Sequence, residues 1–158
     1  MNDAGTAIPK TFEETTLEEM DHVIDINVRG VLVATEAALK HVNDGGRIIM
    51  IGSAVSERVL TAGLVSYSTP KGAVKTFAQA LSREVGSRGI TVNNLQPGPI
   101  DADLNPAAGD WAVPQKATRA LDCYRHVDDA AALAAFVAGS ESSYITGANL
   151  TVDGGMNA

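Results

Sequence analysis

Residues 47–52, Arg47-Ile48-Ile49-Met50-Ile51-Gly52, are the stretch that decides the fold. Four of the six side chains are large and apolar, three of those four are β-branched, and the turn-forming residues Asn43-Asp44-Gly45-Gly46 precede them. A short apolar run of this kind between glycines is typical of a strand that is buried in a parallel sheet. We therefore expect a buried strand here, followed at its carboxyl end by Ser53.

Helices and further strands are predicted on both sides of this run. Before it, the apolar spacing from residue 17 to residue 42 predicts two consecutive helices, or one long helix with an irregular turn near Asn27. After it, the pattern predicts a helix over 66–85, a strand over 90–95, a helix over 127–137 and a strand over 149–152. This alternation indicates an α/β fold, in which helices flank a parallel sheet of three to four strands. Ligands bind beyond the carboxyl ends of such strands, which draws attention to Ser53 and to Gln96-Pro97-Gly98.

Length and charge limit the function classes. The chain has 158 residues, enough for about one domain. Its 12 basic and 19 acidic residues give a net charge of −7, which argues against nucleic-acid and anionic-membrane partners. The N-terminus lacks the basic and apolar regions of a signal peptide, so we expect a cytoplasmic protein. A single cysteine, Cys123, excludes an intrachain disulfide and a cysteine-based zinc site, and no metal site is expected.

A candidate catalytic group lies around the first strand exit. Tyr67 and Lys71 are four residues apart at the start of a predicted helix, so they share one helix face. A nearby ammonium favours a phenolate, so Lys71 is expected to lower the pKa of Tyr67 toward neutrality. Ser53 would hydrogen-bond a carbonyl oxygen in the same place. Taken alone, the spacing is common, and Tyr67 and Lys71 would then be ordinary surface residues.

The order of several motifs resembles the short-chain dehydrogenase/reductase family, and in particular its bacterial 3-oxoacyl-reductase-like members. The matching segments run along nearly the whole chain: Asn2-Asp3-Ala4-Gly5, Ile26-Asn27-Val28, Ile51-Gly52-Ser53, Tyr67-Ser68-Thr69-Pro70-Lys71, Val92-Asn93, Gln96-Pro97-Gly98-Pro99-Ile100, Ile145-Thr146-Gly147 and Val152-Asp153-Gly154-Gly155. The resemblance implies part of a Rossmann-like doubly wound sheet and one domain over residues 1–158. Apart from the resemblance, residues 101–123 carry Pro106, Gly109 and Pro114 around weak helical signals, so we expect a lid there, which contains Trp111.

The resemblance also implies roles for individual residues. Tyr67 would be the acid/base that protonates a carbonyl oxygen as hydride arrives, Lys71 would hold the nicotinamide ribose, and Ser53 would polarise the carbonyl. Asn27 would hold a water that relays protons to Lys71, from an irregular helical turn of a kind found at functional sites. Cofactor contacts are expected at Tyr67 and Lys71, and at Ala4, Gly5, Pro97, Gly98, Pro99 and Ile100.

Three departures from the family pattern stand out. Asp3 replaces a usual asparagine, and Pro70 lies inside the start of a helix. The third departure is larger: the sequence contains no glycine-rich cofactor turn, which holds the pyrophosphate in the family. The chain resembles a truncated member that begins near the end of the family's fourth strand. NAD or NADP is therefore the implied cofactor, and its binding is expected to be weak.

Two functions remain open from the sequence. The first is an oxidoreductase that interconverts a small carbonyl and an alcohol with NAD(P). The alternative is a non-catalytic binding or assembly module, or a truncated product, that forms a homo-oligomer through the retained helices. The family resemblance implies that these helices and the C-terminal strand form subunit contacts. A strand such as 47–52 near an open sheet edge would also recruit partners.

Overall fold

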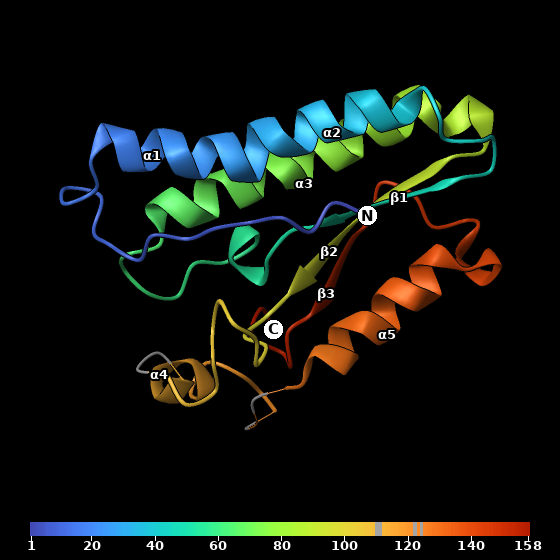
Figure 1. Cartoon of the computed structure of the whole chain (residues 1–158). Coiled ribbons are helices and arrows are strands. Elements are labelled where there is room, and N and C mark those ends of the chain that lie inside the picture. The colour runs from blue at the N-terminus through green and yellow to red at the C-terminus, as the bar shows by residue number, and fades with distance from the viewer. Residues whose placement is uncertain (110–111, 122, 124) are drawn as a thin grey trace.

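A parallel sheet lies between two helical layers in the computed structural model, which describes residues 1–109, 112–121, 123 and 125–158 (Figure 1). The strands are β1 (Arg47–Ile51), β2 (Thr91–Pro97) and β3 (Asn149–Val152), and the helices are α1 (Leu17–Ile24), α2 (Gly30–Leu39), α3 (Val65–Val85), α4 (Ala112–Lys116) and α5 (Val127–Ala138). The sheet order is β1-β2-β3, with every pairing parallel. The expected α/β fold is thus confirmed, with a three-stranded sheet among the residues that the structure describes.

The outer edge of β1 carries the start of a fourth parallel pairing. Asn2 forms an isolated parallel bridge with Met50. Its backbone N–H donates to the Ile49 carbonyl at 2.8 Å, and its carbonyl accepts from the Ile51 N–H at 2.9 Å. Among the described residues, Asn2 is the partner of β1 at the edge of the strand that faces away from β2. The N-terminal segment is thereby aligned with the carboxyl end of the sheet, where Ser53 lies.

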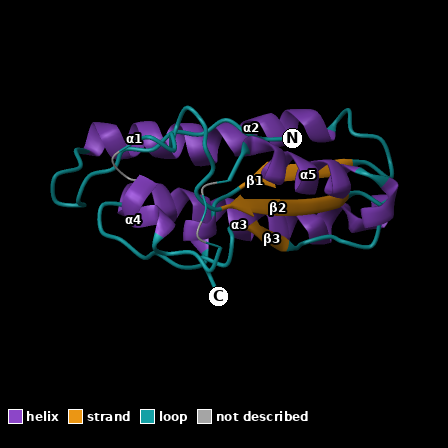
Figure 2. Cartoon of the chain, turned by 90° about the horizontal axis from the view of Figure 1, so that it is seen from below, coloured by secondary structure: helices purple, strands orange, loops and turns teal. Residues whose placement is uncertain are grey.

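Alternate residues of the strands feed two separate cores. The helices α1, α2 and α3 cover one face of the sheet and α5 covers the other, as Figures 1 and 2 show from two directions. On the first face, Ile48 and Met50 of β1 pack with a cluster completed by α2, α3 and β2: Val31, Val74, Ala78, Leu81, Val85, Ile90 and Val92. On the second face, Ile49 packs with Leu95 of β2 and Val137 of α5. Strand β1 is therefore buried on both faces, as its sequence predicts.

One continuous helical rod runs through α1 and α2, and an irregular turn joins them. Residues Asp25–Arg29 form a π-helical turn between Ile24 and Gly30. The prediction of an irregular turn near Asn27 is confirmed. The rod ends at Leu39, three residues earlier than the apolar pattern suggests, because the chain turns there toward Gly45 and Gly46.

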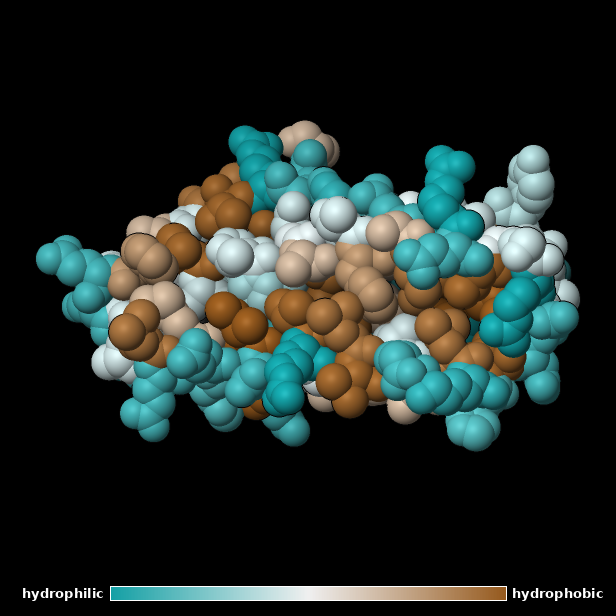
Figure 3. All heavy atoms as spheres, turned by 90° about the horizontal axis from the view of Figure 1, so that it is seen from above, coloured by the Kyte–Doolittle hydropathy of each residue, from teal (hydrophilic) through white to brown (hydrophobic). Residues whose placement is uncertain are grey.

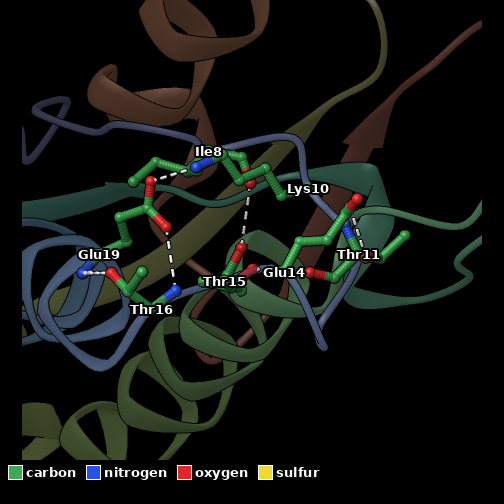
Figure 4. Close-up of polar contacts among 8 residues, drawn as sticks. Ile8, Lys10, Thr11, Glu14, Thr15, Thr16 and Glu19 are labelled. Atoms are coloured by element: carbon green, nitrogen blue, oxygen red, sulfur yellow. Dashed lines mark hydrogen bonds and ion pairs between the residues drawn. The ribbon is translucent and has the colours of Figure 1, made fainter.

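The start of α1 is fixed by a network of side chains (Figure 4). Thr16 and Glu19 form a reciprocal capping box, which satisfies two otherwise unpaired backbone N–H groups. Glu19 also pairs with Lys10, and the Thr15 hydroxyl donates to the Thr11 carbonyl at 2.9 Å. These contacts hold the chain at residues 10–16 against the start of α1.

Strand β2 continues two residues beyond the predicted end at Leu95. Gln96 and Pro97 pair with Thr151 and Val152 of β3, so pairing with a neighbouring strand overrides the turn-forming character of the proline. The segment 101–123, for which the sequence predicts a lid, carries the short helix α4, and the Leu121 N–H donates to the Gly154 carbonyl at 2.9 Å. Trp111 lies outside the described residues.

The close approach of β1 to β2 predicts a specific effect of substitution at Gly52. A Cβ atom there would lie 2.5 Å from Asn94 Oδ1 and 2.9 Å from Asn94 Nδ2, both in a buried side chain. We expect Gly52→Ala to lower the free energy of unfolding by about 1–3 kcal/mol through overpacking. The control is Gly72→Ala on α3, where nothing lies within 4 Å of the new atom.

Urea denaturation of both variants measures the difference. The control should gain about 0.5–1 kcal/mol, because alanine is the better helix former. Equal stability of the two variants would contradict the proposed contact between Gly52 and Asn94.

Candidate active site

Ser53 lies immediately beyond β1, at the carboxyl edge of the sheet. The last β1–β2 hydrogen bond runs from the Gly52 N–H to the Leu95 carbonyl at 2.7 Å, and the backbone then turns into a short 3₁₀-helix, Ala54–Ser56. Ser53 is the N-cap of this turn, is 8% exposed, and has its hydroxyl oxygen 3.4 Å from the Val55 N–H. The hydroxyl also acts on the Tyr67 phenol, whose pKa it lowers. Ser53 and Tyr67 are thus brought together as expected.

Tyr67 and Lys71 lie one turn apart near the start of α3 and face the same site. The Lys71 ammonium lies 5.7 Å from the centroid of the Tyr67 ring, within the range of a cation–π contact. Lys71 is only 4% exposed, and its Nζ donates to the Ile51 carbonyl at 2.9 Å. Lys71 therefore links the carboxyl end of β1 to the helix that carries Tyr67.

Asn27 occupies the π-helical turn and is almost fully buried. Its amide nitrogen donates to the carbonyls of Thr6 and Val23, both at 2.9 Å, and its Oδ1 accepts from the Thr6 N–H at 3.3 Å. The π-turn widens the helix so that one side chain bonds both the helix itself and the N-terminal segment. Asn27 thus fixes that segment where it passes the site.

Gly5 lies between Asn27 and Lys71. A Cβ atom at Gly5 would lie 3.1 Å from Asn27 Oδ1 and 3.4 Å from Lys71 Nζ. The two polar atoms therefore flank one small space, within the reach of a bridging water. Ala4 is exposed on the same segment.

The electrostatics of Tyr67 differ from the sequence-based expectation. Burial raises the pKa of Tyr67 above its usual value, and the hydrogen bond from Ser53 only partly offsets this effect. The expectation that Lys71 lowers the pKa of Tyr67 toward neutrality is therefore wrong for this structure. The reason is that removal from water disfavours the phenolate, while the ammonium is bonded to a backbone carbonyl.

Lys71 is itself shifted by its surroundings. Burial lowers the pKa of Lys71, and the negative charge of Asp3 acts in the opposite direction. Asp3, which the sequence marks as a departure from the family pattern, therefore acts electrostatically on the candidate lysine. Both titratable groups of the site favour their neutral forms more than they would in water.

Residues 97–100 are expected from the sequence to contact the nicotinamide. In the structure, Gly98 packs against Asp153, just beyond β3, whereas Pro99 and Ile100 line a cavity. A Cβ atom at Gly98 would lie 2.7 Å from the Cα of Asp153, so the glycine allows β2 and β3 to approach closely. Pro99 and Ile100 line a cavity of about 260 Å³, together with Arg119, Leu121, Arg125, Asp129, Thr151, Val152, Asp153 and Gly154. The four candidate catalytic residues are not among the residues that line it.

Two polar side chains behind Ser53 make contacts that the sequence does not predict. Gln96 is fully buried, and its amide nitrogen donates to Ser56 and Glu57. Asn157 donates to the Ala54 carbonyl at 3.0 Å. The sequence draws attention to Gln96 only as part of the strand exit Gln96-Pro97-Gly98, and it offers no signal for Asn157.

In residues 1–109, 112–121, 123 and 125–158, no group of three or more His, Cys, Asp or Glu side chains is arranged to hold a metal ion. No helix in the same ranges has the length and apolar character needed to cross a membrane.

Comparisons with known proteins agree on one family. The family model described as enoyl-(acyl carrier protein) reductase matches residues 1–157. A cyclic-di-GMP-binding biofilm dispersal mediator protein of Escherichia coli is 36% identical over 155 residues, which is 98% of this chain and 65% of the relative. A short-chain dehydrogenase of Burkholderia cenocepacia, solved with NADP, superposes with a TM-score of 0.97 at 44% identity and covers 99% of this chain.

A blue fluorescent protein from a metagenomic library, solved with NADPH, superposes equally well, with a TM-score of 0.97 at 43% identity and 99% of this chain covered. The chain spans 64% of the length of each of these two solved structures. The match thus extends over nearly all of this sequence and about two thirds of each relative. The chain belongs to the short-chain dehydrogenase/reductase family.

Proposed function

We propose that the chain provides the catalytic half of an NAD(P)-dependent oxidoreductase that interconverts a carbonyl compound and an alcohol, with Tyr67 as the acid/base. The observation that carries the proposal is the placement of the Lys71 ammonium 5.7 Å from the centroid of the Tyr67 ring near the start of α3, with Ser53 at the adjoining exit of β1. Three chemically suited groups from two elements thus converge at the carboxyl edge of a parallel sheet, where ligands bind.

Each residue has a distinct task in this mechanism. The Ser53 hydroxyl donates to the substrate carbonyl oxygen and orients it beside the Tyr67 phenol. Tyr67, which burial keeps protonated, transfers its proton to that oxygen during reduction and takes it back during oxidation. Lys71 faces the Tyr67 ring and stabilises the phenolate that forms. A water held between Asn27 Oδ1 and Lys71 Nζ would return a proton to the site.

The residues present fit the nicotinamide end of the cofactor. Lys71 Nζ lies close to Gly5 and would donate to the ribose hydroxyls. When bound, NAD(P) would supply or accept the hydride. The sequence has no glycine-rich turn for the pyrophosphate, and the NADP and NADPH complexes belong to relatives about half as long again. We therefore infer that the chain needs a second polypeptide segment for tight nucleotide binding.

A second candidate function is assembly without catalysis, and an exposed apolar face favours it. Figure 3 shows apolar side chains gathered over the layer of α1, α2 and α3, with hydrophilic ones at its margins. Leu17 is 78% exposed, Val33 59% and Ile24 47%. Large exposed apolar surfaces mark interaction sites.

Light scattering after size exclusion measures the molar mass and hence the number of subunits. An oligomer that binds neither NAD(P)H nor cyclic di-GMP would favour assembly without catalysis.

The proposed function predicts weak nucleotide binding and tyrosine-dependent turnover. Each charge-assisted hydrogen bond that the pyrophosphate lacks costs about 1.5–3 kcal/mol, and about 1.4 kcal/mol corresponds to tenfold in affinity. We therefore expect a dissociation constant of about 1 mM or weaker for both NADH and NADPH. Calorimetry with each nucleotide measures it.

Turnover should be tested with a panel of ketones and alcohols at saturating nucleotide. Tyr67→Phe should lower turnover by about 100-fold or more while leaving the calorimetric affinity within a few-fold. Phenylalanine keeps the ring that Lys71 faces, so it is the matched change. Unchanged turnover in Tyr67→Phe, or no heat with either nucleotide, would contradict catalysis by this chain.

Burial of Lys71 predicts how stability depends on pH. Because its pKa in the folded chain lies below 10.5, the folded state loses this proton at a lower pH than the unfolded state. Between these two pKa values the unfolded state binds more protons, so the free energy of unfolding rises with pH. Lys71→Met should remove this contribution to the slope.

Urea denaturation at a series of alkaline pH values provides the measurement. The control is Lys40→Met, whose parent side chain is 66% exposed and pairs with Glu36 on the surface. The control should keep the slope of the unsubstituted chain. A slope in Lys71→Met equal to that of the control would show that the Lys71 charge is not buried.

A further inference from the structure

The turn that carries Ser53 is held by polar contacts rather than by a regular element. After β1 the backbone forms only the three-residue 3₁₀-helix Ala54–Ser56. The Ser56 hydroxyl donates to the Ser53 carbonyl at 2.7 Å, and the Ser56 N–H donates to the same oxygen at 3.0 Å. The position of the Ser53 hydroxyl therefore depends on whatever fixes Ser56 and Ala54.

Gln96 of β2 fixes one side of this turn. Its side chain is 0% exposed, and its Nε2 donates to Ser56 Oγ at 2.8 Å and to Glu57 Oε1 at 2.9 Å. The two amide protons thus have two acceptors. The Ser56 hydroxyl, which accepts from Gln96, keeps its own proton for the Ser53 carbonyl. A continuous chain of hydrogen bonds runs from a rigid central strand to the backbone of Ser53.

Glu57 connects the same chain of contacts to the helix of Tyr67. Its Oε2 pairs with Lys75 Nζ at 2.6 Å, and Lys75 lies two turns beyond Tyr67 on α3. Glu57 is partly buried in this pair, with Gln96 on its other oxygen. The network therefore ties the turn of Ser53 and the helix of Tyr67 to one another.

Asn157 fixes the opposite side of the turn. Its Nδ2 donates to the Ala54 carbonyl at 3.0 Å. The Asp153 carboxylate in turn accepts from the backbone N–H groups of Gly155 at 2.9 Å and Asn157 at 3.1 Å, which shapes the C-terminal turn. A segment about one hundred residues away in the sequence thus contacts the residue that follows Ser53.

We propose that Gln96 and Asn157 are positioning residues that hold the Ser53 hydroxyl in hydrogen-bonding contact with Tyr67. The proposal rests on the proposed function, because it concerns the same serine and tyrosine. Neither side chain touches the reacting atoms; each acts through the turn at residues 54–56. When either contact is lost, Ser53 is still present, but its hydroxyl is no longer held beside the Tyr67 phenol.

The experiment follows the Tyr67 phenol directly and requires no turnover. The chain has three tyrosines, so ¹³Cζ-labelled tyrosine gives three NMR signals, and Tyr67→Phe identifies the one from Tyr67. Its chemical shift is followed through an alkaline titration. Ser53→Ala provides the reference, because losing the serine hydrogen bond should move the titration of Tyr67 to higher pH.

Two variants and one control test the positioning role. Gln96→Met keeps the side-chain length but removes both donors, and Asn157→Leu removes the donor to Ala54. Each should shift the titration of Tyr67 in the same direction as Ser53→Ala, by at least half of that reference shift. The control is Thr91→Val at the other end of β2, where a buried hydroxyl has no hydrogen-bond partner among the described residues. It should leave the titration unchanged.

The outcomes separate this proposal from the proposed function. If Ser53→Ala shifts the titration and neither Gln96→Met nor Asn157→Leu does so, the positioning role is wrong and the serine–tyrosine pair stands. If Ser53→Ala has no effect, the pair itself is absent, and the proposed function fails together with the positioning role. Should Gln96→Met not fold, Asn157→Leu alone decides, since it leaves the buried strand untouched.

Discussion

Parallel pairing between β1 and β2 is the constraint on which the candidate site depends. The pairing brings the carboxyl ends of both strands to one edge, and Gly52 closes the ladder by donating to Leu95. Only a glycine fits there, because the buried Asn94 side chain occupies the space where a Cβ would lie. The chain must then turn away at Ser53, and α3 lies against that turn with Tyr67 facing it. A strand, a turn and the start of a helix thus bring Ser53, Tyr67 and Lys71 to one place.

Burial of this group creates the electrostatic conditions for proton transfer. Lys71 donates to a backbone carbonyl at the end of β1 and faces the Tyr67 ring. A group that is cationic when charged and a group that is anionic when charged are therefore buried side by side. In that environment the neutral forms of both groups are favoured. Asp3, on the N-terminal segment held by Asn27 and the capping network of α1, adds a negative charge that supports the ammonium. The N-terminal segment therefore contributes to the site although it forms no regular strand of its own.

Features with a local cause could be predicted from the sequence. The strand at 47–52 follows from an apolar run between glycines, the shared face of Tyr67 and Lys71 from helical spacing, and the irregular turn near Asn27 from a break in the apolar pattern. Features that depend on distant contacts could not. The direction of the Tyr67 pKa is set by burial beneath other elements, and Gly98 is required by the backbone of Asp153, 55 residues later. The hydrogen bonds from Gln96 and Asn157 to the turn after Ser53 are equally invisible in local sequence. The expected roles of Asn27, Ser53, Tyr67 and Lys71 in catalysis stay predictions.

The central claim is that Ser53, Tyr67 and Lys71 form the nicotinamide end of an oxidoreductase site. A crystal structure of this chain grown with a large excess of NADPH tests it most directly. The account predicts ordered nicotinamide ribose beside Gly5, with ribose hydroxyls in hydrogen-bonding contact with Tyr67 and Lys71, whether or not the adenosine end is ordered. A nucleotide bound elsewhere on the chain, with Lys71 still bonded to the Ile51 carbonyl and no density beside Gly5, would contradict it.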